Sequence, residues 1–276
     1  MAILLALGAS LSWGFADFFG PLKGRALGTL RALVYVQAAG LVAIALVVAI
    51  RGRGPAHPGA LLAIPAALSG TLGLYAYYRG MVVGAMSVVA PIAGVSAAVP
   101  VVVGIASGDR PSAPKLAGMA CALAGVFLAS REPGRSGGTR LAAGVGLALL
   151  AALGFGAYFP AMHAAGRADF WWASLIFRIT STSLVLTTVL VRRPPLRVRV
   201  TDLPVLALVG LGDMLGNLLF AAASSRGLVS VTSVLASLYP IVTVVLARAL
   251  LAERVARAQE LGIVLTLGGV ALISAG

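Results

Sequence analysis

One short pattern of residues occurs twice in the chain, near the end of each half. An acid followed directly by an arginine precedes two glycines, which lie eight and fifteen residues after the arginine. The two copies are Asp109-Arg110 with Gly118 and Gly125, and Glu253-Arg254 with Gly262 and Gly269. Every position is shifted by 144 residues in a chain of 276. Because each copy lies between two long apolar runs, both halves are predicted to end with the same hairpin of apolar helices.

The apolar runs are long enough to cross a lipid bilayer. Hydrophobic residues make up 60% of the chain and charged residues only 11%, which leaves too little charge to cover a soluble domain of this size. The runs are about 18 to 22 residues long, the length that crosses a hydrocarbon core of about 30 Å. Inside lipid each backbone amide needs a partner within its own segment, so these runs are predicted to be helices. The expected fold is therefore an all-α integral membrane protein.

Ten apolar spans are expected, five in each half of the chain. They lie near residues 2–21, 31–50, 60–79, 85–107, 114–130, 141–162, 170–191, 203–223, 228–250 and 257–275. The polar, glycine-rich residues 133–140 are the expected linker between a first repeat at 1–132 and a second repeat at 141–276. Since five is an odd number, the second repeat must enter the membrane from the opposite side. The prediction is therefore an inverted repeat around a central cavity.

The net charge of +13 is concentrated in short loops between the spans, such as residues 192–199. Basic loops of this kind contact lipid headgroups and set the orientation in the membrane, so membrane lipids are expected partners and nucleic acid is not. The first, third, fifth, seventh and ninth loops hold 14 basic residues, and the other loops hold 6. By the positive-inside rule alone, the odd loops would face the cytoplasm and both termini would lie outside.

Several short motifs, taken in order, resemble the EamA family of the drug/metabolite transporter superfamily. They are Ser12-Trp13-Gly14-Phe15, residues 84–92, Ser237-Leu238-Tyr239-Pro240 and the two acid-arginine patterns, and they cover the chain as two tandem repeats. The resemblance implies ten helices, a central cavity and movement of small metabolites by alternating access, commonly as export. It also implies that both termini lie in the cytoplasm, contrary to the charge count. The first helix of the family often carries a Lys after Trp-Gly, whereas this chain has Asp17.

Charged residues inside the spans are the first candidates for a site, because a charge at the centre of a membrane helix costs about 2.5 to 3.5 kcal/mol. Asp213 lies near the middle of the eighth span, with Asn217 one turn later on the same helix face. This pair either binds a proton or substrate in a cavity or forms a hydrogen bond between helices. Asp17 either binds a proton or a cationic substrate, or pairs with Lys23 or Arg25 at the membrane edge.

Arg178 is a cation within the seventh span, with no acid near it in the sequence. An arginine that faces a cavity can bind a carboxylate through two hydrogen bonds, which suits an amino-acid substrate. The alternative is a structural bridge to Asp17 or Asp213. Gln37 in the second span holds roughly the equivalent position in the first repeat, and we take it as a further candidate for the site.

Aromatic residues and prolines complete the expected cavity. Tyr and Trp give an apolar wall with one hydrogen-bonding group, and the candidates are Trp13, Tyr75, Tyr78, Tyr158 and Tyr239. Prolines inside the spans are expected to kink them, for gating or for packing, at Pro91, Pro100, Pro160 and Pro240. Residues at the ends of spans are expected to be structural, as hinges, helix caps or salt bridges: Arg79, Asp109, Arg110, Arg226, Glu253 and Arg254.

The sequence contains no catalytic, metal-binding or nucleotide-binding motif, so we expect neither an enzyme nor a cofactor. The expected function is secondary transport in the cell membrane, with export of amino acids or related small metabolites and protons as the candidate coupling ion. Two alternatives stay open. One is a multidrug exporter of lipophilic cations. The other is a non-transporting membrane scaffold or subunit, which would hold Asp213 and Arg178 in a tight bridge with no cavity beside them.

Overall fold

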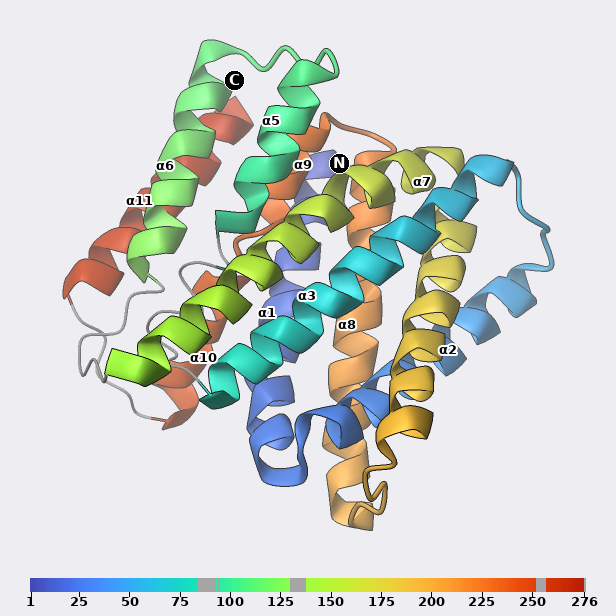
Figure 1. Ribbon diagram of the computed structural model, residues 1–276. Coiled ribbons are helices and arrows are strands. Elements are labelled where there is room, and N and C mark those ends of the chain that lie inside the picture. Colours follow the sequence, from blue (N-terminus) through green and yellow to red (C-terminus); the bar gives the residue numbers. More distant parts are fainter. Residues whose placement is uncertain (84–92, 94, 130–137, 252–256, 276) are drawn as a thin grey trace.

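The computed structural model describes residues 1–83, 93, 95–129, 138–251 and 257–275, and within these ranges it contains helices and no β-strand (Figure 1). The elements are α1 (Ala2–Leu27), α2 (Thr29–Arg51), η1 (Pro58–Leu62), α3 (Ala63–Val83), η2 (Val95–Ala97), α5 (Ala98–Ala106), α6 (Ala113–Ala129), α7 (Gly138–Arg192), η3 (Val200–Asp202), α8 (Leu203–Ser224), α9 (Val229–Ala236), α10 (Tyr239–Leu251) and α11 (Arg257–Ala275). Pro91, Glu253, Arg254 and residues 133–137 of the expected linker lie outside the described residues.

Helix length and composition make this a multi-pass membrane protein. In the described part of the chain, five helical stretches are long and apolar enough to cross a bilayer: Ala2–Leu27, Thr29–Arg51, Pro58–Gly80, Gly144–Arg192 and Val200–Ser224. Shorter apolar helices lie at Ala113–Leu128, Val229–Thr243 and Glu260–Ile273. Large apolar side chains stay exposed on the outside, among them Leu46 (58%), Leu190 (73%) and Val264 (64%). Such a surface suits contact with lipid chains.

The long helix α7 contains two of the expected spans in one run. Asp169 has extended backbone angles (φ −164°, ψ 103°) and divides α7 into an N-terminal segment, residues 138–168, and a C-terminal segment, residues 170–192. Its carboxylate accepts hydrogen bonds from the backbone N–H groups of Trp171 (3.0 Å) and Trp172 (3.2 Å), and so caps the C-terminal segment. The chain therefore changes direction here without a separate loop (Figure 1).

The expected ninth span also divides into two helices. The first of them, α9, ends at Ala236, and α10 begins at Tyr239 with Pro240 in its first turn. Proline lacks a backbone N–H, and the first turn of a helix is where that loss has the smallest cost. All eight residues of α9 are buried, so this short helix lies in the interior of the bundle.

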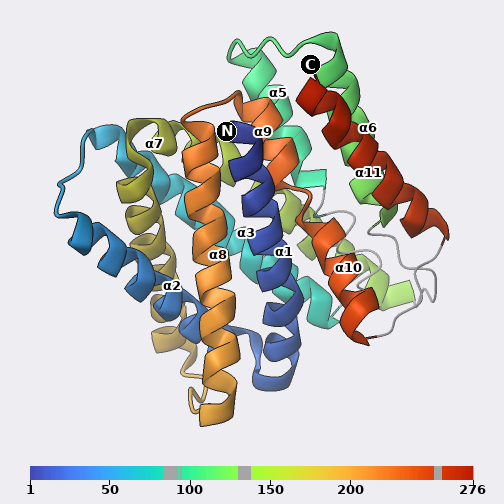
Figure 2. The same ribbon diagram turned by 180° about the vertical axis from the view of Figure 1, so that it is seen from behind.

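The glycines of the repeated pattern meet where α6 packs against α11 (Figures 1 and 2). A Cβ atom on Gly118 would lie 2.7 Å from the backbone oxygen of Gly269, and a Cβ atom on Gly125 would lie 2.6 Å from that of Gly262. The first glycine of each copy thus contacts the second glycine of the other copy. This antiparallel contact explains the spacing, because small residues let membrane helices approach closely.

Two other pairs of helices enclose the centre of the molecule. The first pair is α1 against α8, and the second is α3 against α7. Gly14 of α1 packs on the start of α10, where a Cβ atom would lie 2.8 Å from the backbone oxygen of Tyr239. Gly156 of α7 packs beside η2, where a Cβ atom would lie 3.1 Å from the backbone oxygen of Ser96. Similar glycines in the first and sixth spans therefore make similar close approaches.

Candidate functional site

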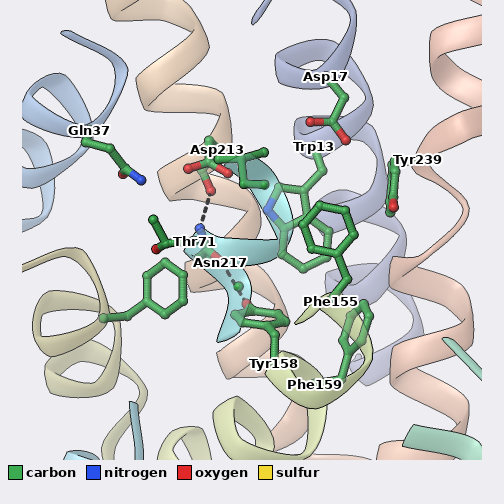
Figure 3. Close-up of a pocket in the computed structure, with 13 residues that line it drawn as sticks. Trp13, Asp17, Gln37, Thr71, Phe155, Tyr158, Phe159, Asp213, Asn217 and Tyr239 are labelled. Atoms are coloured by element: carbon green, nitrogen blue, oxygen red, sulfur yellow. Dashed lines mark hydrogen bonds between the residues drawn. The ribbon is translucent and has the colours of Figure 1, made fainter. Parts of the chain in front are cut away.

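A narrow cavity of about 70 Å³ lies where α1, α2, α3, α7, α8 and α10 meet (Figure 3). The lining residues come from both halves of the chain: Trp13, Asp17, Gln37, Gly70, Thr71, Leu74, Phe155, Tyr158, Phe159, Phe177, Asp213, Asn217 and Tyr239. Most of this wall is aromatic or apolar, and two carboxylates interrupt it.

Helical spacing explains why the lining residues come in groups. Trp13 and Asp17 are four residues apart on α1, and Asp213 and Asn217 are four apart on α8, so each pair shares one face of its helix. The N-terminal segment of α7 presents Tyr158 between Phe155 and Phe159 in the same way. The helices thus turn one polar face and several aromatic faces toward a common centre.

A chain of hydrogen bonds runs along one side of the cavity. Arg178 donates from Nη1 to Asp213 Oδ2 at 2.7 Å and also to Gln37 Oε1. The Asn217 amide donates to the backbone oxygen of Asp213 at 2.8 Å. The Tyr158 hydroxyl donates to Asn217 Oδ1 at 2.7 Å. Side chains from α2, both segments of α7 and α8 are joined by this network.

Arg178 is the centre of this network and is buried, with 1% of its side chain exposed. It does not line the cavity, and its charge is neutralised by Asp213. Gly40 has no side chain and so leaves room for Arg178, because a Cβ atom there would lie 3.1 Å from the guanidinium carbon. Of the two interpretations of Arg178 from the sequence, the contacts correspond to the bridge with Asp213.

Asp17 lies across the cavity from this network (Figure 3). It makes no hydrogen bond or ion pair with any described residue, and it is close enough to Asp213 for the two carboxylates to repel. Lys23, one of its expected partners, instead pairs with Asp202 at 2.6 Å. With Asp213 already paired to Arg178, Asp17 is the carboxylate of the cavity that no described cation balances.

Aromatic rings surround the space beside Asp17. The Trp13 ring lies 5.9 Å from Tyr158, 6.1 Å from Phe159 and 6.5 Å from Tyr239, measured between ring centroids, in edge-to-face arrangements. Tyr158 in turn packs edge-to-face on Phe177 at 5.5 Å. Packing of this kind holds rings in place and leaves an apolar wall that also attracts cations through its π faces.

Comparisons with known proteins now identify the family. A model of the EamA-like transporter family matches residues 1–131 and 142–275. The chain belongs to the EamA-like transporter family. The two matched segments confirm the two tandem EamA repeats expected from the sequence.

A solved structure titled "Crystal structure of protein" also resembles this EamA-like chain, with a TM-score of 0.84. The two sequences are 17% identical over 99% of this chain and 98% of the other, so the likeness shows a shared fold alone. No curated protein matches the chain. As an EamA-like transporter in a multi-pass membrane fold, the protein has a small-molecule substrate and a lipid environment.

Some candidate residues of this EamA-like protein lie away from the cavity. Tyr75 is 36% exposed on the outside of α3, and Tyr78 is buried with its hydroxyl packed against Gly20. Pro160 lies inside the N-terminal segment of α7, and Pro100 is buried near the start of α5. None of these four residues lines the cavity.

Residues at the span ends occupy several environments. Asp109 accepts hydrogen bonds from the backbone N–H and the hydroxyl of Ser230, at 2.9 and 2.7 Å, and so joins the end of α5 to the start of α9. Arg226 donates to the backbone oxygen of Ala222 at 2.6 Å and lies over the ring of Phe170. Arg79 and Arg110 are exposed.

Several lining residues were not among the sequence candidates. Phe155 and Phe159 are four residues apart and so share the helix face of Tyr158, and this spacing was available in the sequence as a signal. No such spacing pointed to Phe177, which precedes Arg178, or to Thr71, which lies one turn before Tyr75. Thr71 differs from the others because its buried hydroxyl has no hydrogen-bond partner in the described part of the chain.

Proposed function

We propose that this EamA-like protein is a secondary transporter built from two inverted repeats of five spans, which rock around the cavity and open it to each side of the membrane in turn. Support comes from contacts between equivalent positions. Gly118 contacts Gly269, and Gly125 contacts Gly262. The order of the contacts is thus reversed between the two helices, as a two-fold axis between α6 and α11 requires. Gln37 and Arg178, which hold roughly equivalent positions in the two repeats, hydrogen-bond to each other beside the cavity.

The proposed cargo is a small metabolite that carries a protonated amine. The observation that carries this proposal is Asp17, an unbalanced carboxylate that faces the aromatic cavity. Amino acids and related metabolites fit through their amino group, whereas the carboxylate contact expected from Arg178 is already taken by Asp213. The aromatic wall also favours the alternative cargo, lipophilic cations, because π faces attract positive charge.

We propose that a proton and the cargo bind in turn at Asp17. A carboxylate inside a membrane protein is costly when it is charged and unpaired, so either a proton or a cation is favoured there. Since both occupy the same group, one leaves when the other binds. An inward proton gradient would then drive export of the amine across the cell membrane.

The alternative of a non-transporting scaffold requires the bridge between Arg178 and Asp213 without a cavity beside it. The bridge is present, with a distance of 2.7 Å, but Asp213 also lines the cavity. Because one partner of the bridge lines the cavity, the arrangement favours a transporter over a scaffold.

The test uses purified protein in liposomes of phospholipid with an imposed pH gradient. Accumulation of radiolabelled small amines and amino acids is measured with the gradient in each direction. We expect amines to move in the direction opposite to the flow of protons. Asp17→Asn should reduce this movement roughly ten- to hundredfold, since a hydrogen bond to a charged group contributes about 1.5 to 3 kcal/mol.

A matched control is Asp202→Asn, which also replaces a carboxylate by an amide but lies outside the cavity, paired with Lys23. It should leave amine transport close to that of the wild type. If liposomes that contain the wild-type protein accumulate neither amines nor amino acids with either gradient, the proposed function is contradicted.

A further inference from the structure

The orientation of the Gln37 side chain is fixed by its neighbour. A guanidinium group only donates hydrogen bonds, so the atom of Gln37 that faces Arg178 must be the oxygen Oε1. The hydroxyl of Ser181 also lies 3.4 Å from this oxygen. The amide nitrogen of Gln37 must therefore point away from Arg178, and in Figure 3 it points into the cavity.

Gln37 and Thr71, which line this side of the cavity, each carry a hydrogen-bond donor that has no partner among the described residues. Gln37 is 2% exposed, and its amide nitrogen donates to no described residue. Thr71 is 5% exposed, and its hydroxyl also lacks a partner among the residues that the structure describes. Buried donors are normally paired, since an unmade hydrogen bond is costly. Both side chains line the cavity, so a bound molecule is the natural source of the missing acceptor.

The two donors and Asp17 lie on opposite sides of the cavity. In Figure 3, Gln37 and Thr71 lie to the left of Asp213, whereas Asp17 and Tyr239 lie to its right. One side thus offers a negative charge and the other offers hydrogen-bond donors. A single molecule that satisfies both sides needs a cation at one end and an acceptor at the other.

Building on the proposed function, we infer that the cargo is an amine whose other end carries an uncharged acceptor, such as a hydroxyl, ether or amide oxygen. The ammonium group binds Asp17, and the acceptor receives hydrogen bonds from Gln37 Nε2 and the Thr71 hydroxyl. The cavity therefore favours amino alcohols and amino amides over both plain alkyl amines and free amino acids.

The preference for an uncharged acceptor follows from the state of Arg178. A cargo carboxylate on this side would lie beside Asp213, and the nearby cation is already bound to that residue. Taking a carboxylate out of water without a free counter-ion is expensive, whereas an uncharged oxygen needs only the hydrogen bonds that are available. A site built to hydrogen-bond its substrate also discriminates strongly against analogues that lack the acceptor.

The experiment compares four cargos of equal chain length in liposomes that contain the purified protein: an alkyl amine, an amino alcohol, an amino amide and an amino acid. Each is tested as a competitor of radiolabelled amino-alcohol uptake under a fixed pH gradient. We expect the amino alcohol and amino amide to compete at least about tenfold better than the other two, the size of a buried hydrogen bond.

Thr71→Val separates recognition from folding, and Gln37→Leu tests the second donor. Valine has nearly the shape of threonine and breaks no hydrogen bond seen in the structure, so T71V should fold and should narrow the preference for the amino alcohol over the alkyl amine. Q37L removes the second donor and should narrow the preference further.

The outcomes distinguish this inference from the function on which it rests. If no amine is transported, the proposed function itself fails. If amines are transported but all four cargos compete equally, or if T71V keeps the full wild-type preference, the function stands and the inference is overturned. A preference for the free amino acid would also overturn it.

Discussion

At the scale of single residues, the two carboxylates of the cavity differ in their charge partners. Arg178 and Asp213 form an ion pair, whereas Asp17 lines the cavity without a cation partner among the described residues. The sequence could place Asp213 and Asn217 together, because residues four apart share a face of any α-helix. The partner of Arg178 could not be chosen from sequence, since Asp17 and Asp213 were equally available before the helices were packed.

The rotation of α3 illustrates what else could not be predicted. Thr71 and Leu74 of this helix line the cavity, whereas Tyr75 lies outside and Tyr78 packs elsewhere. A membrane helix is apolar around its whole circumference, so no apolar stripe tells which face turns inward. Tyr75 and Tyr78 were candidates because of their chemistry alone, but Thr71 is the polar residue of α3 that lines the cavity.

A prediction at this scale concerns the buried ion pair. Asp213→Asn leaves the Arg178 charge buried without a counter-ion, and breaking such a pair costs on the order of 3 kcal/mol or more. We expect a clear fall in the thermal unfolding temperature of the purified protein. The double variant with Arg178→Gln should regain much of this loss, because no charge is then left unpaired. A double variant less stable than Asp213→Asn would contradict this view of the bridge.

At the scale of helices, close approach through glycine explains much of the sequence. The repeated glycines of α6 and α11 predicted a pair of similar hairpins, and the structure shows that these glycines contact each other. The breaks inside the expected spans were harder to foresee. Asp169 starts a new helix segment without any loop, and the division between α9 and α10 depends on tertiary contacts that the apolar sequence does not show.

Two adjacent glycines of α11 provide a matched test of this contact. A Cβ atom on Gly269 would lie 2.6 Å from the backbone oxygen of Gly118, whereas a Cβ atom on Gly268 would meet nothing within 4 Å. Gly269→Ala should therefore destabilise the protein by about 1 to 3 kcal/mol, as overpacking does. Gly268→Ala should have little effect. Thermal unfolding in detergent measures both, and equal effects would contradict the packing described for α6 and α11.

At the scale of the whole molecule, the repeat and its broken symmetry have separate roles. Equivalent glycines build both halves, whereas Asp17 and Asp213 differ in their pairing and give the cavity its polarity. The sequence predicted two repeats of an all-α membrane protein, because composition and period determine these features. It could not determine the direction of insertion, since the charge count and the habit of the family disagree.

Orientation in the membrane is therefore a prediction of its own. The C-terminal end of α1 and residues 192–199 lie at the end of the molecule opposite to both chain termini (Figure 1). Lys23, near this end of α1, pairs with Asp202. The positive-inside rule places this basic end in the cytoplasm and the termini outside. A phosphatase fused to the C-terminus, which is active only outside the cytoplasm, should be active. A fluorescent protein that matures only in the cytoplasm should stay dark at the same position, and the reverse pattern would contradict the prediction.

The most direct test of the central claim is proton release on cargo binding. Purified protein in weakly buffered detergent is mixed with an amino alcohol, and a pH indicator records any protons released. If cargo and proton share Asp17, binding should release protons, and cargo affinity should rise with pH because fewer protons compete. Asp17→Asn should release none, while Asp202→Asn should behave as the wild type. Equal proton release and equal affinity in Asp17→Asn would contradict the account.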